Sequence, residues 1–280
     1  MPQPSGNGMN GERMLQARQT SMILSQDDPD PVEIVNRAGA SEFVLTCEHA
    51  GRAIPRRLGD LGVAAEDMDR HIAWDIGADG LSRALASLLD APLVLQRYSR
   101  LVVDCNRPFE AADCFREISD GTPIPANRSH SDADRMQRFV EIHEPLHRTI
   151  GELLDERARE GRRTVLVSVH SFTPVLGGVQ RPWLVGALAN RDTSFANAFL
   201  QAFAARNPGV SMALNQPYSV DDLSDYTIPV HGERRRLAHV LLEVRNDQIG
   251  DPAGQALWAQ RLADALRDAS HSLKELTNVG

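Results

Sequence analysis

Short apolar runs alternate with longer amphipathic segments from residue 43 towards the end of the chain. Most of the short runs place apolar and β-branched side chains at successive positions, which is typical of strands buried on both faces of a sheet. On this pattern we predict strands at 43–47, 93–95, 101–103, 164–169, 183–187 and 239–244.

The longer segments repeat their apolar residues at helical spacing, as Leu81, Leu85 and Leu88 do within 78–89. Further helices are predicted at 133–159, with a break near Pro145, at 194–206 and at 252–276. The last of these should be capped by Asp251 and opened by Pro252. Apolar strands alternating with helices predict an α/β domain whose sheet is covered on both faces.

The first 38 residues differ from the rest of the chain in composition. They are rich in Pro, Gly, Asn, Gln and Asp, and their apolar residues are few. Such a composition favours a mobile segment over a packed one. We therefore expect a flexible leader at 1–38 and one domain at 39–280.

Charge and cysteine content narrow the function classes. The 280 residues include 30 Lys and Arg against 38 Asp and Glu, a net charge of −8, which argues against a nucleic-acid partner. No apolar run approaches the roughly 18 residues that cross a bilayer, so no membrane partner is expected. Three widely spaced cysteines form no disulfide framework, and the start of the chain resembles no signal peptide, so a cytoplasmic location is expected.

Two histidines, His49 and His170, close predicted strands and lead into loops. In α/β sheets such positions meet at one edge, where ligands bind. Asp75 stands at the mouth of the helix predicted at 78–89 and is the best third ligand. Two His and one carboxylate with an open position describe a catalytic metal site. The alternative for each histidine taken alone is a purely structural residue whose polar atoms are hydrogen-bonded within the fold. The alternative for Asp75 is a helix N-cap.

A competing motif occupies residues 143–147. Its sequence, HEPLH, matches the H-E-x-x-H pattern of zinc metalloproteases, in which both histidines share one face of an unbroken helix. Pro145 removes a backbone N–H and displaces Glu144 from helical angles. We therefore expect His143 and His147 not to share a helical face, although His147 by itself can still approach the active site.

Five stretches, in this order, resemble the N-formylglutamate amidohydrolase family. They lie at 47–55 (CEHAGRAIP), 71–77 (HIAWDIG), 99–108 (SRLVVDCNRP), 169–174 (VHSFTP) and 239–245 (HVLLEVR). The resemblance spans residues 43 to about 265. It implies a single three-layer α/β/α domain with a mixed, mostly parallel sheet, similar in fold to zinc carboxypeptidases.

The resemblance also implies one zinc ion per chain, held by His49, Asp75 and His170. Carboxypeptidases place a glutamate ligand three residues after the first histidine, where this chain has Arg52. Asp75 takes that role in the comparison, and Glu48 is its rival. Because Glu48 follows an alternating strand, it should point away from His49 and act as an outer partner.

Glu243 matches the general base of the family, which moves a proton from water to the leaving amine. A simple ion pair with Arg245 is the alternative. Asn106 and Arg107 resemble a pair that binds a terminal carboxylate, and Arg100 would bind a second carboxylate or the oxyanion. Pairing of both arginines with Asp104 is the structural alternative. Two further candidates are Arg181, at the mouth of the site, and Tyr226, in a polar loop at 221–232 that could act as a lid or simply pack.

The implied function is zinc-dependent hydrolysis of a linear amide, with N-formyl-L-glutamate giving formate and L-glutamate. A small N-acyl amino acid is thus the expected partner. The alternatives are a related hydrolase for another N-acyl amino acid or a cell-wall peptide, and a non-catalytic binding protein on a decayed scaffold. Retention of both histidines, Asp75 and Glu243 speaks against decay, because a binding module needs no base beside a metal.

Overall fold

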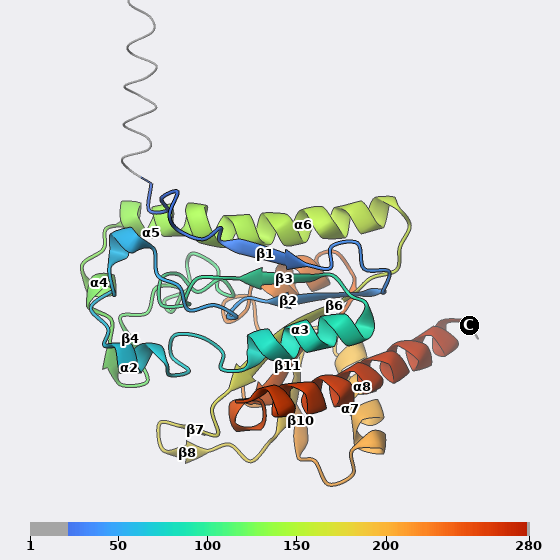
Figure 1. Cartoon of the computed structure of the whole chain (residues 1–280). Coiled ribbons are helices and arrows are strands. Elements are labelled where there is room, and N and C mark those ends of the chain that lie inside the picture. The colour runs from blue at the N-terminus through green and yellow to red at the C-terminus, as the bar shows by residue number, and fades with distance from the viewer. Residues whose placement is uncertain (1–21, 279–280) are drawn as a thin grey trace, which may run out of the picture.

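The computed structural model describes residues 22–278, with side chains up to Glu275, and a seven-stranded sheet lies at its centre (Figure 1). Five of the strands consist mainly of buried residues, and the two edge strands are partly exposed. In spatial order its strands are β1 (Val32–Val35), β3 (Leu93–Gln96), β2 (Phe43–Cys47), β6 (Val165–Phe172), β11 (Ala238–Arg245), β9 (Val185–Leu188) and β10 (Met212–Leu214).

Most neighbouring strands run parallel. The pairs β2–β3, β2–β6, β6–β11 and β9–β10 are parallel, whereas β1–β3 and β9–β11 are antiparallel. The predicted α/β class with a mixed, mostly parallel sheet is therefore confirmed. The three central strands, β2, β6 and β11, all run the same way, so their carboxyl ends meet at one edge.

Helices cover both faces of the sheet. The helices α3 (Ala78–Leu89), α7 (Ser194–Arg206) and α8 (Pro252–Asn278) pack together on one face, and α6 (Glu144–Arg159) lies on the other (Figure 1). Each face has its own apolar core. Trp258, Phe199 and Leu85 belong to the first core, and Leu146, Ile150 and Leu154 to the second. The sheet is thus the middle layer of three, as predicted.

Helix bounds follow the apolar spacing closely. The predictions at 78–89 and 194–206 match α3 and α7, and α8 begins at Pro252 as expected. The Gly254 N–H donates to Asp251 Oδ1 at 2.9 Å, so Asp251 does cap this helix. Although α8 has 27 residues, none of the helices in the described range is both long and apolar enough to cross a membrane.

The predicted break near Pro145 takes the form of a wider helical turn. The helix α5 (Asp132–Arg138) continues through the π-helical turn η2 (Phe139–His143) into α6. A π-turn displaces the backbone bonding by one residue, and Pro145, which cannot donate, falls in the first turn of α6, where no donor is needed. The chain therefore stays helical from 132 to 159.

Short elements complete the chain. They are the helical turns η1 (Arg56–Leu58), α2 (Ala65–Met68), α4 (Pro125–Arg128), η3 (Ile228–Glu233) and η4 (Asn246–Gln248), and the hairpins β4 (Ile118–Ser119) with β5 (Thr122–Pro123) and β7 (Val175–Leu176) with β8 (Val179–Gln180). In Figure 1 both hairpins and α2 gather at the end of the sheet where β6 leads into β7.

Two sequence expectations need correction. Residues 101–103 form a buried turn, not a strand, because side chains satisfy their carbonyl groups: Asn127 donates to Leu101 O and Arg138 to Val102 O. The strand β1 lies within the segment predicted as a leader and pairs with β3. The sheet therefore includes four residues of that segment, while a leader at residues 1–21, which fall outside the described range, stays a prediction.

Candidate active site

Three neighbouring strands deliver the polar residues of the site. His49 follows β2 by two residues, His170 lies near the end of β6, and Glu243 lies near the end of β11. His170 and Glu243 are direct register partners, so both side chains leave the same face of the sheet at one level. The predicted convergence at the carboxyl edge of the sheet is what the structure shows.

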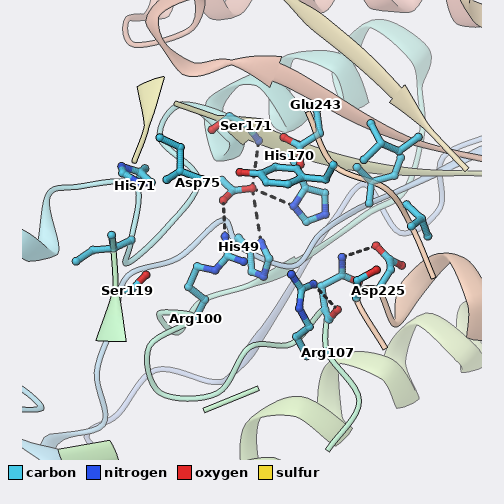
Figure 2. A pocket seen from close by; sticks show the side chains of 18 of the residues that line it. His49, His71, Asp75, Arg100, Arg107, Ser119, His170, Ser171, Asp225 and Glu243 are labelled. Carbon is cyan, nitrogen blue, oxygen red and sulfur yellow. Dashed lines mark hydrogen bonds and ion pairs between the residues drawn. The ribbon is translucent and has the colours of Figure 1, made fainter. Parts of the chain in front are cut away.

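Asp75 lies between the two histidines (Figure 2). Its Oδ2 atom is 2.9 Å from His170 Nδ1 and 3.6 Å from His49 Nδ1. One nitrogen or oxygen from each of the three residues lies within 4.8 Å of the others, and all three side chains are buried. Among the described residues this is the one such group of potential metal ligands.

Outer hydrogen bonds orient both imidazole rings. His49 Nε2 lies 2.7 Å from Asp104 Oδ1, and His170 Nε2 lies 3.0 Å from Glu48 Oε2. Metal-binding histidines ordinarily bond a carboxylate through the nitrogen that does not face the metal. His49 Nδ1 is buried and has no hydrogen-bond partner among residues 22–278, so this nitrogen is suited to bind a metal ion. The donor set fits a divalent metal with nitrogen and oxygen preference.

This geometry also assigns Glu48. It contacts the far side of His170, and its second oxygen accepts a 2.8 Å hydrogen bond from Thr227 Oγ1. Glu48 is thus the outer partner that the sequence analysis expected, and Asp75 is the carboxylate that faces both histidines.

Backbone contacts fix the position of Asp75. Its N–H donates to His49 O at 2.9 Å, and Ser171 N–H donates to its Oδ2 at 3.1 Å. The N-cap of α3 is Gly77, at φ 81°, so Asp75 precedes the cap and its carboxylate is free for other contacts. A Cβ at Gly77 would lie 2.1 Å from Ile249 O, so only glycine allows this turn.

Buried charges of opposite sign alternate around the group. Burial would raise the pKa of Asp75 and of Asp104. His49 and His170 hold the pKa of Asp75 below its ordinary value, and Arg100 and His49 hold that of Asp104 below its ordinary value. Burial would lower the pKa of His170, but its bonds to Asp75 and Glu48 raise it well above the ordinary value. The carboxylates of Asp75 and Glu48 thus favour the protonated form of His170.

Glu243 differs from the other carboxylates. It is 6% exposed, and its Oε2 atom has no hydrogen-bond partner in the described part of the chain. Burial raises its pKa to about 8, against the lowering effect of His170. The alternative ion pair with Arg245 is not formed, because Arg245 Nε bonds Asp247 Oδ1 at 2.9 Å. Glu243 is therefore a carboxylate poised to exchange a proton.

A cavity of about 330 Å³ opens over these residues. Its walls include the three potential ligands, Glu243 and three arginines, which are Arg100, Arg107 and Arg116. Arg100 reaches Asp75 Oδ1 at 3.2 Å and Asp104 Oδ2 at 2.8 Å. Figure 2 shows Arg100 and Arg107 beside His49, facing the same space. A small anionic molecule suits this volume and charge.

A family model described as "N-formylglutamate amidohydrolase" matches residues 41–250, three quarters of the sequence. The chain belongs to the N-formylglutamate amidohydrolase family. Membership agrees with the resemblance seen in the five sequence stretches, and it makes this protein an amidohydrolase-family hydrolase.

Similar proteins match this chain over most of its length. It is 26% identical over 262 residues to an N-formylglutamate deformylase of Pseudomonas aeruginosa, covering 85% of this chain and 93% of that protein. The crystal structure of a gene product from Agrobacterium tumefaciens is 34% identical, with a TM-score of 0.87 over 90% of this chain and 99% of that one. An N-formylglutamate amidohydrolase from Ralstonia eutropha shares the fold, at 16% identity and a TM-score of 0.60 over 88% and 100% of the two chains.

Asn106, Arg181 and Tyr226, which were predicted to bind substrate, contact other parts of the protein instead. The Asn106 side chain lines the cavity but holds the backbone N–H groups of Tyr226 and Thr227 and the Asp225 carboxylate. Arg181 and Tyr226 are not among the described residues that line the cavity. Arg181 Nη1 donates to Tyr218 Oη at 2.9 Å, and it is Tyr218 that reaches the cavity wall.

The HEPLH histidines do share a helical face, contrary to prediction. The ring centroids of His143 and His147 are 4.4 Å apart, because the π-turn keeps the helix continuous past Pro145. They form no metal group. Instead His143 Nε2 lies 2.9 Å from Arg107 O and His147 Nε2 2.6 Å from Cys105 O. Tyr226 packs on both rings. The pair therefore supports the loop that carries Asp104 and Arg107.

Sequence reasoning missed Arg116 and Tyr218 and gave Asp104 no role toward His49. All three lie in loops without hydrophobic periodicity, so no pattern pointed to them. For Asp104, its place in the stretch at 99–108 was the one available signal. The turn at 101–103 that aims Asp104 at His49 is held by Asn127 and Arg138, which lie far along the chain.

Proposed function

We propose that the chain is a zinc-dependent hydrolase that cleaves N-formyl-L-glutamate to formate and L-glutamate. The observation that carries the proposal is the meeting of the His49, Asp75 and His170 donor atoms with the unpartnered carboxylate of Glu243 in one cavity. The name of the Pseudomonas relative supports the substrate, and the arginine-lined wall supports an acidic one.

Binding begins at the arginines. The α-carboxylate of the substrate docks on Arg107, whose planar fork meets a carboxylate through two parallel hydrogen bonds. Arg100 lies nearer the proposed metal ligands, beside the place of the formyl carbonyl, where its charge stabilises the developing oxyanion. The N-formyl group then faces Glu243.

Hydrolysis then needs a water molecule and a proton carrier. A divalent ion held by His49, Asp75 and His170 would polarise the formyl carbonyl and acidify a nearby water molecule. The positive charge of that ion would lower the pKa of Glu243 and keep its carboxylate ionised, so that Glu243 accepts the proton as the water oxygen bonds to the formyl carbon. It returns the proton to the amine as the C–N bond breaks, so formate and glutamate leave and Glu243 is regenerated.

The test is Glu243→Gln, measured by formate release and by metal content. We expect the variant to keep its metal and lose at least about a hundredfold in turnover, because glutamine has nearly the same shape but cannot accept a proton from water and pass it on. Glu66→Gln, at an exposed position on α2, is the matched control. Near-normal turnover would remove Glu243 from the mechanism. Hydrolysis of other N-acyl amino acids without N-formyl-L-glutamate would remove the proposed substrate.

A further inference from the structure

We infer that Arg116 binds the side-chain carboxylate of the substrate, next to Arg107, and so sets a preference for N-acyl amino acids with two carboxylates. This inference rests on the proposed function, because it assigns Arg107 to the α-carboxylate. Its basis is the position of Arg107 and Arg116 on the cavity wall, where both contact Asp113; we call these two residues the arginine pair.

Asp113 holds the two arginines of the pair side by side. Arg107 Nε is 3.0 Å and Arg116 Nη2 is 2.7 Å from the same atom, Asp113 Oδ2. Both guanidinium groups line the cavity, whereas Asp113 does not belong to the described cavity wall. Asp113 therefore holds the two guanidinium groups as neighbours beside the cavity. Two carboxylates separated by a short carbon chain match two adjacent forks.

The charge on this wall is incompletely balanced. Arg100 has two carboxylate partners, Asp75 and Asp104, while Arg107 and Arg116 share Asp113 alone. Asp120, another carboxylate of the cavity, is paired with Arg70 at 2.9 Å. Within the arginine pair, one positive charge thus lacks a carboxylate of its own among the described residues, in a chain whose net charge is −8. A second substrate carboxylate would neutralise it.

Arg116 also has a donor to spare. Its Nε atom is buried and lacks a hydrogen-bond partner among the described residues. Leaving such a donor unsatisfied costs free energy, so this guanidinium group has an unmet demand for a hydrogen-bond acceptor. Burial and the nearby charge of Arg100 lower the pKa of Arg116, and an added negative charge would act in the opposite direction.

Two substrates that differ only in the side-chain charge test the assignment. N-formyl-L-glutamate and N-formyl-L-glutamine are compared for the unchanged chain, Arg116→Gln and Arg116→Lys. We expect Arg116→Gln to lose about tenfold to a hundredfold in kcat/KM on the glutamate substrate, mainly through KM, and to lose most of the preference between the two. Arg116→Lys should recover part of that preference. Arg128→Gln, at an exposed position on α4, is the control.

Equal losses on both substrates in Arg116→Gln would overturn the assignment and leave the proposed function intact. Calorimetric titration with glutarate, which has two carboxylates and no amide, tests the subsite independently of hydrolysis. The unchanged chain should bind glutarate more tightly than pentanoate, and Arg116→Gln should lose that difference. If both binding results are obtained but neither formyl substrate is hydrolysed, the proposed function is overturned and the dicarboxylate subsite stands. Equal affinity of the unchanged chain for glutarate and pentanoate would overturn the subsite.

Discussion

His49 and His170 show how the outer nitrogen of a histidine determines what the inner nitrogen can do. Asp104 and Glu48 occupy the Nε2 atoms, so both Nδ1 atoms face Asp75. The family stretches in the sequence located His49, Asp75 and His170, and strand alternation placed Glu48 on the far side. They did not reveal that Asp104 orients His49, because that contact depends on how a turn without periodicity is folded.

The contribution of Asp104 can be measured by replacing it with asparagine. We expect Asp104→Asn to weaken metal binding by about 10- to 100-fold, since the carboxylate orients His49 and raises its basicity. Competition with a chromophoric chelator gives the affinity. Asp69→Asn, which removes an exposed carboxylate paired with Arg52, should leave the affinity unchanged. An unaltered affinity in Asp104→Asn would mean that His49 is oriented by the chain alone.

Among the elements, the helical segment from Asp132 to Arg159 is the one whose path the sequence did not resolve. Proline at 145 correctly indicated an irregularity, but local rules could not specify a π-turn, which depends on the tertiary contacts of His143 and His147. The regular elements α3, α7 and β2 were predictable because their apolar spacing and their burial agree. The edge strand β1 was not, because only four residues in a polar segment form it.

The contacts between α6 and the loop that carries Asp104 and Arg107 should stabilise the fold. His147→Leu leaves the buried carbonyl of Cys105 without its donor, so the free energy of unfolding should fall by about 1–3 kcal/mol. Urea titration monitored by circular dichroism measures the change. The control is His271→Leu on the exposed face of α8, where the effect should stay within about 0.5 kcal/mol. Equal effects of the two substitutions would show that the hydrogen bond between His147 and the Cys105 carbonyl does not stabilise the fold.

For the whole molecule, the layered architecture follows more directly from the sequence than the geometry of the site does. Continuous apolar strands and amphipathic helices require a sheet covered on both faces, whatever the loops do. The site combines side chains from β6, β11 and the segments that follow β2 and precede α3, so the metal position joins distant parts of the domain. Removal of a metal ion bound there should therefore lower the stability of the whole domain.

Metal removal should lower the melting temperature, and by more at higher pH. A ligand at roughly 1,000 times its Kd adds about 4 kcal/mol to stability. In the metal-free chain the raised pKa values of His170 and Glu243 give stability that is present at low pH and lost as pH rises. Metal binding also displaces the His170 proton, so affinity increases with pH.

Thermal melting with zinc and with a strong chelator at pH 6 and pH 8 measures this trend. The difference in melting temperature should be larger at pH 8, and His170→Ala should show none at either pH. A zinc-dependent shift that persists in His170→Ala would place the ion elsewhere, and a shift that is larger at pH 6 would contradict the displaced proton.

The direction of α8 bears on how the protein can be handled. Its later residues Arg267 and Lys274 lie beside Ser41 and Arg163, near the beginning of β2 and β6, whereas His170 and Glu243 lie near the opposite ends of β6 and β11. Figure 1 shows the later part of α8 at the starting ends of these strands. Tethering the molecule to a solid support through its last helix should therefore leave substrate entry unobstructed, so an immobilised preparation should keep the KM of the free protein.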